Sequence, residues 1–82
     1  MKLTSLRKNG QRVVGFKQTI KAVMEGNVTC IFLANDADLV IREKIVNLCN
    51  SAGIELIYID SKAKLGEACG IDVGSATAAL LK

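Results

Sequence analysis

The chain has 82 residues, half of them apolar, and a formal net charge of +3. A chain of this length forms one small domain, and its apolar content lets it build a core without a metal or disulfides. Its longest apolar runs are too short to span a bilayer, and no secretory leader pattern is visible. We therefore expect a single domain over residues 1–82 that is cytoplasmic and has no membrane partner.

The first quarter of the chain is strongly basic. Residues 1–21 contain no acid and six cations, namely Lys2, Arg7, Lys8, Arg12, Lys17 and Lys21. The acids gather in residues 22–61, where six carboxylates face two cations. This asymmetry indicates a basic face for nucleic acid or another polyanion, although chance clustering in a short segment would give the same counts.

The residues that enzymes and metal sites need are missing from the sequence. Cys30, Cys49 and Cys69 are widely spaced among apolar neighbours, which is typical of buried free thiols in a reducing compartment. No histidine is present to complete a zinc site or activate a thiol. Asp36 and Asp38 are explained more simply as a helix cap than as a catalytic or metal pair. We therefore expect no enzymatic activity, no cofactor and no metal.

The hydrophobic periodicity predicts alternating helices and strands. In chain order these are a short helix over 1–9, a strand over 11–14, a helix over 16–25, a buried strand over 28–34, a helix between the polar 35–38 break and Gly53, a buried strand over 54–59, and a helix between Ser61 and Gly70. Alternation of this kind is typical of an α/β fold, a three-layer α/β/α sandwich with a mixed central sheet.

Helical spacing also predicts which side chains face the core. The inward sets are Phe16, Ile20, Val23 and Met24 in the first long helix, Ile41, Ile45, Leu48, Cys49 and Ala52 in the second, and Leu65, Ala68 and Cys69 in the third. Residues 71–74 are too few for another element, so their apolar side chains are expected to be exposed. The alanines of residues 75–81 favour a helix, whereas a closing sheet would need a strand there.

A glycine followed by two lysines and a glutamine marks the start of the 16–25 helix. Gly15 has no Cβ, so the backbone can turn sharply and a partner can approach closely. Lys17, Gln18 and Lys21 share the face opposite the apolar one. Because exposed amides at a helix start favour anions, this segment could hold phosphates and base edges. A solvated amphipathic helix with a glycine entry would show the same pattern.

Two segments resemble signatures of one known family. The sequence Gly-Phe-Lys-Gln-Thr-Ile-Lys at 15–21 resembles the helix start of the kink-turn RNA-binding ribosomal proteins of the seven-Ae and thirty-e type. Residues 61–74 resemble the second signature of that family, and the 33–38 stretch lies between the two at the fitting spacing. The resemblance covers almost the whole chain, is closest to small bacterial members, and favours about four strands, with the 75–81 tail as the last.

The resemblance implies binding to a sharply bent RNA helix–bulge–helix with tandem sheared G·A pairs. Gly15 would let the RNA backbone come close, while Lys17, Gln18 and Lys21 would contact guanine edges and phosphates. The 71–74 loop would cover bulged nucleotides, and Arg12 is a further phosphate contact on grounds of charge. The candidate RNA-binding residues are thus Arg12, Gly15, Phe16, Lys17, Gln18, Lys21, Ile71, Asp72, Val73 and Gly74. The implied partner is a kink-turn in ribosomal or regulatory RNA, bound by a monomer.

The sequence departs from the archaeal branch of that family, which has an Asn-Glu pair at Lys17 and Gln18. Lysine is a point donor where asparagine can donate and accept, so the base contacts and RNA preference are left open. A platform that stacks single-stranded bases is disfavoured, because Phe32 and Tyr58 lie in strands expected to be buried. The alternative function is a protein-interaction adaptor of the same fold, which would not need six cations in its first quarter.

Overall fold

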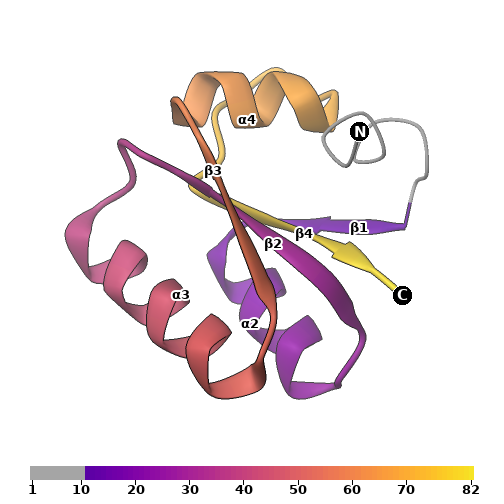
Figure 1. Cartoon of the computed structure of the whole chain (residues 1–82). Coiled ribbons are helices and arrows are strands. Elements are labelled where there is room, and N and C mark those ends of the chain that lie inside the picture. The colour runs from indigo at the N-terminus through magenta and orange to yellow at the C-terminus, as the bar shows by residue number, and fades with distance from the viewer. Residues whose placement is uncertain (1–10) are drawn as a thin grey trace.

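A mixed four-stranded sheet lies at the centre of residues 11–82, the part of the chain that the computed structural model describes (Figure 1). In chain order the elements are β1 (Arg12–Val14), α2 (Phe16–Met24), β2 (Val28–Ala34), α3 (Leu39–Ala52), β3 (Glu55–Ile59), α4 (Lys62–Cys69) and β4 (Thr77–Leu81). Helix α4 covers one face of the sheet and helices α2 and α3 cover the other, so the predicted three-layer α/β/α architecture is confirmed (Figure 1). The helix predicted over 1–9 lies outside the described residues.

The strand directions bring every helix start of the described region to one edge of the sheet. The strand order is β1-β4-β2-β3, and β4 is antiparallel to both of its neighbours while β2 and β3 are parallel. Strands β1, β2 and β3 therefore point the same way, and α2, α3 and α4 begin where these strands end. Strand β4 begins at this same edge, which we call the helix-start edge. Open α/β sheets bind ligands beyond the carboxyl ends of their strands, so this edge is the first place to look for a site.

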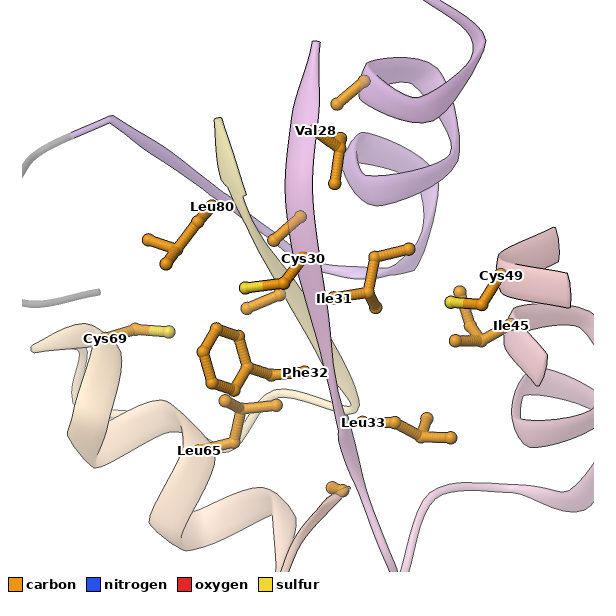
Figure 2. Packing of buried hydrophobic residues seen from close by; sticks show 14 of the residues in the cluster. Val28, Cys30, Ile31, Phe32, Leu33, Ile45, Cys49, Leu65, Cys69 and Leu80 are labelled. Carbon is orange, nitrogen blue, oxygen red and sulfur yellow. The ribbon is translucent and has the colours of Figure 1, made fainter. Parts of the chain in front are cut away.

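Strand β2 is the centre of the core, as its apolar sequence predicts. Residues 30–34 are completely buried, with alternate side chains on opposite faces of the sheet. Figure 2 shows Phe32 beside Leu65 of α4 on one face, and Ile31 near Ile45 and Cys49 of α3 on the other. A strand covered on both faces carries no polar alternation, which explains the nearly continuous apolar run.

The C-terminal tail forms a strand, as the family resemblance favours. Strand β4 lies between β1 and β2 and pairs with both of them. Ala78 and Ala79 are completely buried there. Pairing on both sides satisfies the backbone groups of this segment, and this tertiary gain outweighs the helical preference of its alanines.

Helix α2 is rotated relative to the predicted inner face. Met24 was expected to face the core, but its side chain is 80% exposed, and the buried residues of α2 are Thr19 and Ala22. Phe16 and Val23 are partly buried and pack against the core. Small side chains on the sheet-facing side let the helix lie close to the small residues of β4, which the periodicity of large apolar residues alone could not reveal.

Strand β3 and the end of α3 are also more exposed than expected. Tyr58 is 54% exposed, because β3 is an edge strand of the sheet and has a neighbour only in β2 among the described residues. Ala52, predicted on the inner face of α3, is exposed, whereas Ile45 and Cys49 are buried as expected. None of the helices within residues 11–82 is long and apolar enough to cross a membrane.

The helix caps agree with the sequence except for the acidic pair. Gly53 and Gly70 adopt the left-handed conformation that ends α3 and α4. Asp36 was expected to cap the helix that follows it, but its Oδ1 accepts from the backbone amide of Lys62, 2.7 Å away, and so caps α4. Asp38 occupies the N-cap position of α3 without a side-chain capping bond within the described residues. Asp36 thereby joins the end of β2 to the start of α4.

Gly66 allows the segment after α4 to pack against that helix. A Cβ built on Gly66 would lie 3.0 Å from the Cα of Gly74 and would overlap the carbonyl oxygen of Val73. Both neighbours are backbone atoms, which cannot move aside as a flexible side chain can. The 71–74 loop therefore depends on glycine at this position.

We predict that Gly66→Ala destabilises the protein by about 1–3 kcal/mol through overpacking. In an unconstrained helix the same change would stabilise by about 1 kcal/mol through helix propensity. Urea denaturation monitored by circular dichroism measures the difference. The control is Ala63→Gly at an exposed position of the same helix, which should cost about 1 kcal/mol through propensity alone. A Gly66→Ala variant more stable than the parent would contradict the close packing.

Candidate nucleic-acid interface

Gly15 forms a turn that other residues would not adopt without strain. It joins β1 to α2 with φ 103° and ψ 158°, a region of backbone space open essentially to glycine. Its amide donates to the carbonyl oxygen of Thr77 at 2.8 Å. A Cβ on Gly15 would meet nothing within 4 Å among the described residues, so the space beside the turn is open to a partner. With no side-chain cap, the first amides of α2 also face that space.

The three polar residues predicted on the outer face of α2 are exposed. Lys17, Gln18 and Lys21 all lie on the solvent side of the helix. Gln18 and Lys21 line a hollow of about 140 Å³ between α2 and the ends of the adjacent strands, together with Glu25, Asn27 and Leu81. Among residues 11–82 neither lysine makes an ion pair, in contrast to Lys64, which contacts Asp60 at 3.1 Å. Their ammonium groups are therefore available to an anionic partner.

The 71–74 loop presents one apolar side chain to solvent rather than two. Val73 is 70% exposed, whereas Ile71 is partly buried and packs against the core. The amide of Ile71 donates to the carbonyl oxygen of Gly66 at 3.1 Å, which turns the chain back over α4. Asp72 and Gly74 are exposed. Of the predicted apolar cover, the structure leaves Val73 as the part that a ligand can reach.

The glycine turn and the 71–74 loop meet at the helix-start edge. The amide of Gly15 bonds to Thr77, and Gly74 is three residues before Thr77, a span of at most about 10 Å. One ligand can therefore touch both segments. Exposed Lys62 adds a cation that was not among the predicted site residues: a Cβ on Gly74 would lie 3.2 Å from the Cβ of Lys62. Its place within the second family signature was the available signal.

Arg12 and Phe16 have structural partners of their own. The Nη2 of Arg12 donates to the carbonyl oxygen of Cys69 at 2.7 Å, so its guanidinium lies at the C-terminal end of α4, where a cation is favoured. Its Nε is buried without a partner within the described residues. The ammonium of Lys44 lies 5.9 Å from the centre of the Phe16 ring. These contacts support the fold around the site, and direct contacts of Arg12 and Phe16 with a ligand stay predictions.

The cysteines do not form a reactive centre. None of the three forms a disulfide, and all three are buried. Burial raises the pKa of the Cys49 thiol, and it also raises the pKa of Cys69 despite the opposing effect of the Arg12 guanidinium. A thiol with a raised pKa stays protonated near neutral pH and is a poor nucleophile. Among residues 11–82, no group of three His, Cys, Asp or Glu side chains could hold a metal ion.

Three buried hydroxyls behind the glycine turn were not anticipated from the sequence. The Oγ1 of Thr19 donates to the carbonyl oxygen of Gly15 at 2.8 Å and lies 3.3 Å from the Oγ1 of Thr77. The Oγ of Ser75 donates to the carbonyl oxygen of Thr77 at 2.7 Å. Thr19 and Thr77 are completely buried, and Ser75 nearly so. The signal was a threonine four residues after Gly15, a spacing at which a helical hydroxyl can reach back to a carbonyl.

Comparisons with known proteins agree with this architecture. The chain is 49% identical over 69 residues to an RNA-binding protein of Caldanaerobacter subterraneus subsp. tengcongensis, an alignment that covers 84% of each chain. It is 47% identical over 73 residues to the RNA-binding protein YbxF of Geobacillus stearothermophilus, covering 89% of each. Among solved structures, the 15.5kD RNA binding protein of Giardia lamblia superposes with a TM-score of 0.88 at 26% identity, covering 98% of this chain and 68% of that one.

A family model extends the match to the whole sequence. The model of the ribosomal protein L7Ae/L30e/S12e/Gadd45 family matches residues 1–82. The family resemblance drawn from the two sequence signatures is thereby confirmed. From its sequence, its fold and its relatives, this chain belongs to the ribosomal protein L7Ae/L30e/S12e/Gadd45 family.

Proposed function

We propose that this protein binds RNA through the helix-start edge and that its target is a kink-turn, a sharply bent helix–bulge–helix. The observation that carries the proposal is the meeting of Gly15, exposed Lys17 and exposed Val73 at one edge, with Lys21 one turn farther along the exposed face of α2. The RNA-binding names of its relatives support the class of ligand. The absence of a nucleophile–base pair within the described residues favours a binding protein over an enzyme.

The physical basis is that a sharp bend brings RNA phosphates together, and their repulsion opposes the bend. A protein that binds the bent form more tightly than the straight form shifts the RNA population toward it. In the proposed complex, Lys17, Lys21 and Lys62 offset the phosphate charge, and the open space beside Gly15 admits the RNA backbone. Val73 shields bases that are unstacked at the bulge. The proposed setting is a kink-turn in ribosomal or regulatory RNA, bound by a monomer in a reducing, cytoplasmic compartment.

A gel-shift titration tests the specificity directly. The protein is titrated against a kink-turn RNA and against a straight duplex of the same length, both at the same salt concentration. We expect tighter binding to the kink-turn, because the duplex offers phosphates but neither bulged bases nor a bend. Equal binding to both RNAs would indicate nonspecific electrostatics, and binding to neither would favour an adaptor that binds protein partners.

We predict that Lys21→Ala weakens kink-turn binding and flattens the salt dependence of the affinity by about 1 in the log–log slope. The reason is that one fewer phosphate contact releases one fewer counterion. Fluorescence titration at several salt concentrations measures the slope. The matched control is Lys82→Ala, which removes the same charge after the end of β4, where Lys82 lines a different hollow with Gly53 and Ile54. A slope unchanged in Lys21→Ala would remove this residue from the interface.

We predict that Val73→Asp impairs kink-turn binding without unfolding the domain. Val73 is 70% exposed, so its replacement costs little core packing, whereas a carboxylate there would repel phosphates and no longer cover bases. Affinity and melting temperature are measured together. Met24→Asp is the matched control, because it introduces the same charge at an exposed apolar position at the far end of α2. Full affinity in Val73→Asp would show that the loop does not cover the RNA.

A further inference from the structure

The buried polar side chains of the described residues gather at one place. They are Thr19, Ser75 and Thr77, and all three belong to the hydroxyl cluster behind the glycine turn. They come from α2, from the segment that follows the 71–74 loop, and from the start of β4. The rest of the core is apolar. A buried polar cluster in a small apolar domain costs desolvation, so its concentration behind a candidate site calls for a reason.

The donors and acceptors of the cluster can be assigned by counting protons. The single proton of the Thr19 hydroxyl goes to the Gly15 carbonyl, so Thr77 is the donor in the contact between the two threonine hydroxyls. The Thr77 carbonyl uses both lone pairs, one for the Gly15 amide and one for the Ser75 hydroxyl. The cluster therefore contacts both the carbonyl and the amide of Gly15, and it joins the glycine turn to the segment that follows the 71–74 loop.

The same connection continues to α4. The amide of Ser75 donates to the carbonyl oxygen of Lys62 at 3.0 Å, and the amide of Lys62 is held by Asp36. The base of the 71–74 loop is thus tied on one side to the α4 start and on the other to the glycine turn. The backbone groups in these contacts keep a hydrogen-bond partner without the threonine hydroxyls. The Gly15 carbonyl, for example, also accepts from the Thr19 amide at 3.0 Å.

We infer that Thr19, Ser75 and Thr77 are positioning residues that hold the start of α2 and the 71–74 loop in one preformed arrangement for RNA. The inference rests on the proposed RNA-binding function. A preformed surface avoids the cost of ordering two separate segments on binding, so the hydroxyls contribute to affinity rather than to folding stability. This separates the inference from an ordinary structural role, in which affinity and stability would fall together.

Two double variants separate an effect on RNA affinity from an effect on folding stability. Thr19→Val with Thr77→Val keeps the shape of both side chains and removes both hydroxyls, and it leaves no buried group unpaired in the described contacts. Replacing both partners of a buried hydrogen bond in this way is nearly neutral or stabilising. Thr19→Ser with Thr77→Ser does the reverse, because it keeps the hydroxyls and removes buried methyl groups.

The measurements are the dissociation constant for the kink-turn RNA, the urea midpoint, and the amide exchange rate of Gly15 in the free protein. The valine pair should keep its midpoint, bind about tenfold more weakly and exchange the Gly15 amide faster. The serine pair should lose stability yet keep most of its affinity. Ser75→Ala, which removes the bond on the loop side, should also weaken binding, and it decides the matter if the valine pair does not fold. The inference would be overturned if the affinities of the variants fell in proportion to their urea midpoints. It would also be overturned if the valine pair or Ser75→Ala bound the RNA with full affinity.

Lys21→Ala separates this failure from a failure of the proposed function. If Lys21→Ala weakens kink-turn binding while the hydroxyl variants bind like the parent, the RNA-binding function stands and the positioning role falls. If Lys21→Ala and the parent protein both bind the kink-turn no better than a straight duplex, the proposed function itself falls.

Discussion

The hydrogen bond from the Gly15 amide to the Thr77 carbonyl joins two segments that are far apart in the sequence and form one surface in the fold. On one side of it β1 ends and α2 begins, and on the other the chain leaves the 71–74 loop and enters β4. The bond forms because Gly15 adopts a backbone conformation that other residues avoid. The direction of the α2 start and the position of the loop therefore depend on the same contact.

The sheet topology explains why this contact lies where a ligand can reach it. Strand β4 is inserted between β1 and β2 in the opposite direction, so its beginning lies beside the ends of the strands that lead into the helices. Each helix of residues 11–82 starts at that edge, and Lys17 and Lys62 lie in the first turns of α2 and α4. Asp36 and the hydroxyl of Ser61 accept from the amides of Lys62 and Lys64 at the start of α4, while the starts of α2 and α3 have no side-chain capping bond among the described residues. Of these two helices, α2 is the one that carries Lys17 and Lys21.

The apolar core and the candidate site lie in different parts of the molecule. The apolar side chains on both faces of β2 form the core, as Figure 2 shows, and they lie behind the helix-start edge. The edge itself contains the glycine turn, the buried hydroxyls and the exposed Lys17. Departures from ideal local structure of this kind are expected at functional sites, where they are compensated by the surrounding core.

The sequence by itself determined the α/β alternation, the central buried strand 28–34, the helix ends at Gly53 and Gly70, and the exposure of Lys17, Gln18 and Lys21. These features follow from local periodicity and backbone chemistry, and the two signatures identified the family. Only the tertiary structure decided that Met24 and Tyr58 are exposed, that Asp36 caps α4, and that Thr19 is buried against Thr77. Each of these depends on which element packs beside another. Contacts between residues tens of positions apart in the chain produce no periodic pattern in the sequence, so they could not be predicted from it.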